Sequence, residues 1–203
     1  MKIRKEFSAL LLLLSLILAL LPLTANRSFT AKPEKLLPEV LNKDVSFTVD
    51  QVAEFIVRED NTVQLIDLRS TEEFRIEAIP GAVNIPYPEF IGKDPEAWLG
   101  NKKIRNIFYT TKDTEADYAL VYARGLGYEN SYVMEGGITE WTTTVMETKF
   151  AGDRITAREN ALFETRRRAG EMFTQLNSLP DSLKTQFLES RKFSAKKLDG
   201  GCE

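Results

Sequence analysis

Side chains that can act as nucleophiles, general bases or metal ligands are scarce in this sequence. Its 203 residues contain no histidine and a single cysteine, Cys202, which is next to last. Without histidine, Ser-His and Cys-His catalysis are excluded. One cysteine can form neither an intrachain disulfide nor a cysteine-rich zinc site. The sequence therefore predicts no metal and no cofactor, and its net charge of −3 does not favour nucleic acid as a partner.

A polar loop follows an apolar run near the middle of the chain. The run, residues 104–109, is typical of a buried strand, and the loop consists of Thr110, Thr111, Lys112, Asp113, Thr114 and Glu115. Open α/β sheets bind their ligands at the carboxyl ends of the strands, so the three hydroxyls could hold a small polar ligand. Alternatively, these hydroxyls or Asp113 cap a helix that runs to about residue 126.

Asp67 and Arg69 stand at the end of the preceding apolar run, residues 63–68. An arginine in this place could bind an anion. A buried acid–base pair at a strand end also braces the loops around it, and we favour this second interpretation.

The elements that must position these residues alternate between strand and helix. Thr48–Gln51 and Ser70–Glu73 have the form of capping boxes, each followed by apolar residues at helical spacing. Compact β-prone runs occupy residues 63–68, 104–109 and 131–134. This alternation predicts an α/β fold, a central parallel sheet with helices on both faces.

Four stretches of the chain carry a family resemblance. They are residues 67–74 (DLRSTEEF), 79–86 (IPGAVNIP), 127–128 (GY) and 132–141 (YVMEGGITEW). In order and spacing they resemble the successive signatures of a single rhodanese-like domain. The resemblance covers roughly residues 46–146 and implies a rhodanese-like fold.

The resemblance also implies a chemistry. Active members are sulfurtransferases, in which a cysteine at the end of the central strand takes a sulfur atom from thiosulfate or a persulfide and passes it to a thiol. Here the cysteine position falls on Thr110. A threonine hydroxyl stays protonated and holds no transferable persulfide, while Asp113 and Glu115 oppose an anionic donor. The Gly-His pair usual before Ile-Pro-Gly-Ala is replaced by Glu77 and Ala78.

Two functions follow from these departures. The first is a catalytically inactive rhodanese-like domain that serves as an interaction module for a protein partner or a small anionic ligand. The alternative keeps an enzyme: Cys202, on the hinge of Gly200 and Gly201, reaches the Thr110 loop and carries the persulfide in place of the missing cysteine. Phosphatase chemistry is a poorer third option, because phosphatase relatives of this fold also depend on the loop cysteine.

The N-terminal segment has the composition of an export signal. Lys2, Arg4 and Lys5 precede an apolar stretch that ends near a small-residue cleavage site at Ala25. We therefore expect residues 1–25 to be an export signal or an uncleaved membrane anchor, and residues 26–45 to be a linker. The rest of the chain would be delivered to the periplasm or cell envelope.

Residues 147–203 lie outside the resemblance and are expected to form a helical C-terminal extension with a flexible tail. Helical patterns cover residues 155–175 and 182–194, separated by Pro180. These helices either pack on the domain or on each other, or form an arm that docks on a partner or, through arginines 166–168, on a membrane surface. Cys202 could also link two chains as a disulfide dimer.

Overall fold

The computed structural model describes residues 43–150 and 156–188, together with positions 11, 13, 15, 34 and 38. Most of the expected export signal, most of the expected linker and Cys202 lie outside the described residues. Within the described residues, no helix has both the length and the apolar character needed to cross a membrane.

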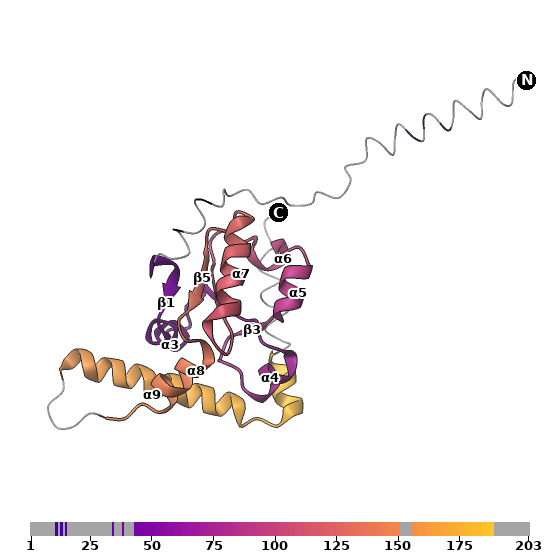
Figure 1. The fold of residues 1–203 in the computed structure, drawn as a ribbon. Coiled ribbons are helices and arrows are strands. Elements are labelled where there is room, and N and C mark those ends of the chain that lie inside the picture. The colour runs from indigo at the N-terminus through magenta and orange to yellow at the C-terminus, as the bar shows by residue number, and fades with distance from the viewer. Residues whose placement is uncertain are drawn as a thin grey trace, which may run out of the picture.

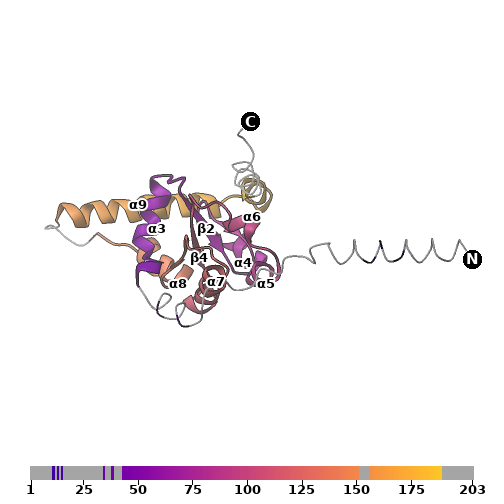
Figure 2. The ribbon, with the colours of Figure 1, turned by 90° about the horizontal axis from the view of Figure 1, so that it is seen from above.

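The described chain forms one parallel sheet between two layers of helices (Figures 1 and 2). The strands are β1 (Ser46–Phe47), β2 (Val63–Asp67), β3 (Val83–Asn84), β4 (Arg105–Tyr109) and β5 (Ser131–Met134), arranged in the order β1-β5-β4-β2-β3. All four strand pairings are parallel. The predicted fold class is therefore confirmed.

Helices fill the connections between the strands and also lie before β1 and after β5. They are η1 (Lys43–Val45), α3 (Val49–Val57), α4 (Thr71–Ile76), α5 (Tyr87–Gly92), α6 (Glu96–Leu99), α7 (Asp113–Gly125) and α8 (Gly137–Trp141). A π-helical turn, η2 (Thr142–Met146), continues α8, and the long helix α9 (Ala157–Asn177) follows. Residues 181–188 are again helical.

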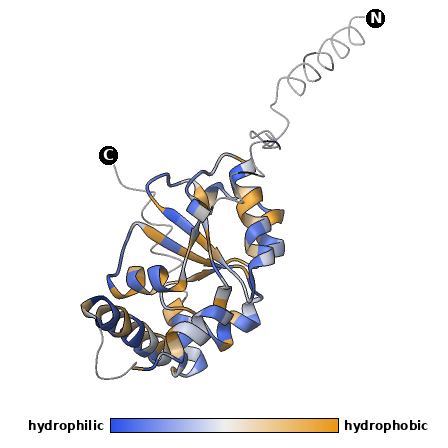
Figure 3. Cartoon of the chain, turned by 60° about the vertical axis from the view of Figure 1, so that its left-hand side comes forward, coloured by the Kyte–Doolittle hydropathy of each residue, from blue (hydrophilic) through white to orange (hydrophobic). Residues whose placement is uncertain are grey.

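Two hydrophobic clusters lie on the two faces of the sheet. Alternate residues of a strand point to opposite faces, so Ile107 and Tyr109 pack with α3, α8 and α9, whereas Phe108 packs with α5, α6 and α7. In Figure 3 the helices carry both hydrophobic and hydrophilic residues, as expected for helices that bury one side. Both faces of the sheet are thereby covered, and the strand ends are where polar groups gather.

The C-terminal helices pack on the domain. Arg166 of α9 forms an ion pair with Asp50 of α3, with 2.6 Å between Nε and Oδ1. Phe173 and Leu176 of α9, and Leu188 beyond it, are buried in the same cluster as Ala78. Of the two interpretations of this segment, packing on the domain is confirmed for residues 157–188.

Candidate functional site

The Thr110 loop lies where the sequence pattern places it. β4 ends at Tyr109 and α7 begins at Asp113, so the loop connects the carboxyl end of a central strand to a helix. It lies between the end of β2 on one side and the turn that joins β5 to α8 on the other. This is the edge at which an α/β sheet presents its ligand-binding loops.

Thr110 itself is turned inward. Its side chain is only 3% exposed, and its hydroxyl donates a hydrogen bond to the carbonyl oxygen of Lys112. The Thr110 carbonyl oxygen accepts from the N–H of Ile138 at 2.9 Å. The hydroxyl and the carbonyl oxygen of this residue are thus used within the protein, and neither faces an incoming ligand.

The turn between β5 and α8 closes over the loop. The Asp113 carboxylate accepts from the Gly136 N–H at 2.6 Å, and the Thr139 hydroxyl donates to the Thr111 carbonyl oxygen at 2.8 Å. Gly137 has a φ of +57°, and a Cβ there would lie 2.3 Å from the Thr110 carbonyl oxygen. Only glycine fits this close approach of two backbones.

One local prediction about this loop is wrong. The helix was expected to be capped by Thr114, by Asp113 or by the loop hydroxyls, but the cap position is Lys112 and its side chain makes no capping hydrogen bond. The Asp113 carboxylate is instead bonded to Gly136, 23 residues further along the chain. The long-range bond to a backbone N–H of the neighbouring turn replaces the local cap.

The outer side of the loop is exposed and carries charges of both signs. Residues 111–115 are exposed, and none of the hydrogen bonds formed in the described part of the chain uses their backbone N–H groups. Burial, together with the charge of Asp113, raises the pKa of Asp117 one turn into the helix. The start of α7 is therefore locally acidic, and this negative charge opposes the binding of an anionic ligand.

Asp67 and Arg69 form a buried ion pair at the end of β2. The Arg69 Nη2 lies 2.6 Å from the Asp67 Oδ2, and the Arg69 N–H donates to the Asp67 Oδ1 at 2.9 Å. The same Nη2 donates to the Glu77 carbonyl oxygen at 2.7 Å. Asn84 of β3 donates to the carbonyl oxygens of both members of the pair. This arrangement braces three loops, as the favoured interpretation requires.

The pair also sets the electrostatics beneath the Thr110 loop. The Arg69 guanidinium lies 5.8 Å from the centre of the Tyr109 ring. Burial, and then the negative charge of Asp67, raise the pKa of the Tyr109 hydroxyl well above its usual range. Tyr109 therefore stays protonated and packs as a core residue rather than acting as a base.

Comparison with known proteins assigns this architecture to a family. The model for the rhodanese-like domain matches residues 48–144. These residues form a rhodanese-like domain. The match runs from the start of α3 into η2 and includes β2 to β5, so the predicted resemblance is confirmed.

Named relatives of this rhodanese-like domain include sulfurtransferases. The mitochondrial thiosulfate sulfurtransferase RDL2 of Saccharomyces cerevisiae is 29% identical over 136 residues, covering 59% of this chain and 80% of the relative. The thiosulfate:glutathione sulfurtransferase of the same yeast is 27% identical over 108 residues, covering 48% and 78%. The solved structure of yeast RDL2 has a TM-score of 0.42 with 28% identity, covering 48% of this chain and 88% of that one.

A polar clamp that no sequence pattern indicates joins the rhodanese-like domain to the C-terminal helices. Asn177 accepts from the Ala78 N–H at 2.9 Å and donates to the Ala78 carbonyl oxygen at 3.0 Å. Lys184, 2% exposed, donates to the Asn177 Oδ1 and to the Ile76 carbonyl oxygen. These partners are about a hundred residues apart in sequence, so no local pattern connects them.

Two cavities lie away from the Thr110 loop. One, of about 480 Å³, opens at the amino ends of β2 and β4, and the other, of about 430 Å³, lies between η2 and α9. Neither is lined by residues 110–115. Among the residues that the structure describes, no group of three or more Cys, Asp or Glu side chains could hold a metal ion.

Proposed function

We propose that this rhodanese-like domain does not transfer sulfur from its Thr110 loop and instead acts as a non-catalytic interaction module for a protein or a small anionic ligand. The observation that carries the proposal is the buried Thr110 hydroxyl, which is donated to the Lys112 carbonyl oxygen at the place where the family resemblance requires a thiolate. A hydroxyl so placed is neither ionised nor exposed, and in this chain no histidine is available to activate it.

The test is a thiosulfate-to-cyanide sulfurtransferase assay on the full-length protein. We expect no turnover above that of Thr110→Val, which removes the hydroxyl and keeps the side-chain shape. Turnover that is lost in Thr110→Val would overturn the proposal.

A second test places the family's cysteine at position 110. We expect Thr110→Cys alone to remain without robust activity, because Asp113 and Glu115 leave the loop acidic and thiosulfate is an anion. The triple variant Thr110→Cys with Asp113→Asn and Glu115→Gln is the comparison. Robust activity of the single variant would show that the surrounding loop is still competent.

Sulfur transfer through Cys202 is the alternative, and the names of the yeast relatives favour it, since both are sulfurtransferases. In this function the Cys202 thiolate attacks the sulfane sulfur of thiosulfate, releases sulfite, and holds the sulfur as a persulfide. Mass spectrometry after thiosulfate treatment would find one added sulfur atom on Cys202, absent in Cys202→Ser. An unmodified thiol would exclude this alternative.

We further propose that the chain is exported, with residues 1–25 either removed as a signal or kept as a membrane anchor, and that the domain lies in the periplasm or cell envelope. The basic start followed by an apolar stretch supports this location. Protease protection in intact cells, lost after the outer barrier is opened, tests it. The same preparation, run on a gel with and without reductant, tests a Cys202-linked dimer.

A further inference from the structure

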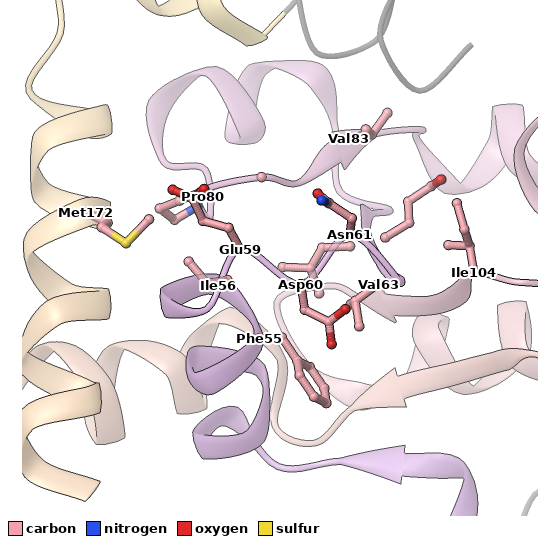
Figure 4. A pocket seen from close by; sticks show the side chains of 13 residues that line it. Phe55, Ile56, Glu59, Asp60, Asn61, Val63, Pro80, Val83, Ile104 and Met172 are labelled. Atoms are coloured by element: carbon pink, nitrogen blue, oxygen red, sulfur yellow. The ribbon is translucent and has the colours of Figure 1, made fainter. Parts of the chain in front are cut away.

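The larger cavity lies at the amino ends of the strands, opposite the Thr110 loop. Its lining comes from the end of α3, the start of β2, the Pro80–Gly81 turn and α9, as Figure 4 shows. The buried residues Ile56 and Leu65 line it, and Met172 reaches it from α9. The floor is thus apolar, and the volume of about 480 Å³ is within the range of ligand sites.

One wall of this cavity is an open edge of the sheet. β3 pairs with β2 only at Ile66 and Asp67, while β4 pairs along the whole of β2. The Asp67 carbonyl oxygen points to the β3 side, because it accepts from the Ile85 N–H at 2.9 Å. By the alternation of a strand, Val63 and Leu65 direct their backbone groups to this side as well.

Two of these backbone groups are free. Because β3 pairs with β2 only at Ile66 and Asp67, its ladder does not reach the Val63 carbonyl oxygen or the Leu65 N–H, and no described turn or loop bonds to them. An acceptor and a donor, two residues apart on an uncovered edge, are what an extended peptide backbone pairs with in strand addition. The wall therefore fits a short stretch of extended chain.

The rim of the cavity carries an uncompensated acid. Glu59 ends α3 in the left-handed region, with φ of 52°, and is the only such non-glycine residue among those described. Its carboxylate has no hydrogen bond or ion pair with the described residues, whereas the neighbouring Asp60 is bonded to Thr62 and to Arg105. Glycine would adopt this backbone conformation without strain. That a charged residue stands here instead indicates that its carboxylate serves to bind a partner.

We propose that residues 190–197 of the same chain dock in this cavity as an added strand beside β2. This segment, SRKFSAKK, has four positive charges, no acid and one aromatic residue, Phe193. The positive charges complement Glu59, and Phe193 fits the apolar floor formed by Ile56, Leu65 and Met172.

The chain can reach the site. Leu188, the last described residue, is buried in the same cluster as Ala78 and Ile79, and the next residue, Pro80, lines the cavity. Phe193 follows Leu188 by five residues, which span about 16 Å when extended. This inference does not depend on the proposed function, because it concerns the opposite end of the sheet from Thr110.

Hydrogen exchange at the Leu65 amide, measured by NMR on the full-length protein in detergent, tests the docking. We expect Glu59→Lys to accelerate exchange at Leu65 by about tenfold, since one backbone hydrogen bond is lost. The double variant Arg191→Glu with Lys192→Glu should have the same effect. The triple variant reverses the charge both at the rim of the cavity and in the tail, so opposite charges face each other again and exchange at Leu65 should be slow. Glu129→Lys, on an exposed residue that does not line the cavity, is the matched control.

A second measurement uses the single cysteine. A nitroxide attached to Cys202 should broaden the amide signals of Asn61 and Gly81, which line the cavity, more than that of Glu129, and Glu59→Lys should abolish the difference. Equal exchange at Leu65 in all variants, or broadening that Glu59→Lys leaves unchanged, would overturn the proposal. So would acceleration by Glu59→Lys without any effect of the tail variant, because the occupant would then be another molecule.

Discussion

At the carboxyl end of β4, the hydroxyl and the carbonyl oxygen of Thr110 both form hydrogen bonds with neighbouring backbone groups. At the amino end of β2, by contrast, the Val63 carbonyl oxygen and the Leu65 N–H have no partner in the described chain. Gly137 brings a second turn against the Thr110 loop, leaving no room even for a Cβ. Around Val63 and Leu65 a cavity of about 480 Å³ stays open. Two ends of one sheet are thus built in opposite ways.

The contrast shows that the edge at which this fold usually binds ligands is not the edge at which the sheet of this chain is left unpaired. Ligands of α/β sheets are expected at the carboxyl ends of the strands because loops and helix N-termini converge there. In this chain that end is closed by contacts that a reacting centre would have to break. The unpaired backbone groups of the sheet edge lie at the other end, where the fold alone predicts no site.

The largest expected effect concerns the brace below the closed end. Arg69→Leu should lower the free energy of unfolding by about 4 kcal/mol, because it leaves the Asp67 carboxylate buried without its partner. Asp67 is 0% exposed and Arg69 6%. Urea denaturation measures the loss. Arg58→Leu removes an arginine whose side chain is 72% exposed and paired with Glu54, and should change stability by less than about 0.5 kcal/mol. Equal losses in the two variants would show that the brace is unimportant.

A smaller loss is expected where the two turns meet. Gly137→Ala should cost about 3 kcal/mol, since the new Cβ would overlap the Thr110 carbonyl oxygen and the backbone is left-handed there. Gly92→Ala is the matched control, because nothing lies within 4 Å of a Cβ at that position. If the two variants have the same denaturation midpoint, the turn can move away, and the loop is less tightly closed than its contacts indicate.

How much of this could be read from the sequence depends on the range of the contacts. The capping boxes of Thr48 with Gln51 and of Ser70 with Glu73 are both confirmed, at the starts of α3 and α4. The helix after the loop was expected to run to about residue 126, and α7 ends at Gly125, with Gly127 at a φ of 94° just beyond it. Such features involve residues within four positions of each other, so composition and spacing decide them.

Long-range contacts decided the rest. Asp113 does not cap the helix as expected, because its carboxylate accepts a hydrogen bond from the Gly136 N–H. Asn177 forms a hydrogen bond with Ala78, which is 99 positions away in the sequence. The second C-terminal helix was expected over residues 182–194, and among the described residues a helix covers 181–188. The sequence did not predict which surface this helix packs on, because an amphipathic pattern shows that one side of a helix is buried but not what covers it. The cavity at β2 combines four separate segments, and no single stretch carries its signature.

The smallest expected effect has the opposite sign and lies at the open end. Glu59→Gly should raise the free energy of unfolding by about 1 kcal/mol, because glycine adopts the left-handed conformation at the end of α3 without the penalty of a Cβ. Glu59→Ala, which loses the carboxylate but keeps the Cβ, is the control and should bring no such gain. Together with the losses at Arg69 and Gly137, a gain at Glu59 would mean that the closed end is optimised for stability and the open end is not, as expected for a surface kept for binding. If Glu59→Gly still destabilises the fold when Arg191→Glu and Lys192→Glu have removed the proposed contact with residues 190–197, the carboxylate has a partner within the described fold, and the contrast between the two ends of the sheet fails.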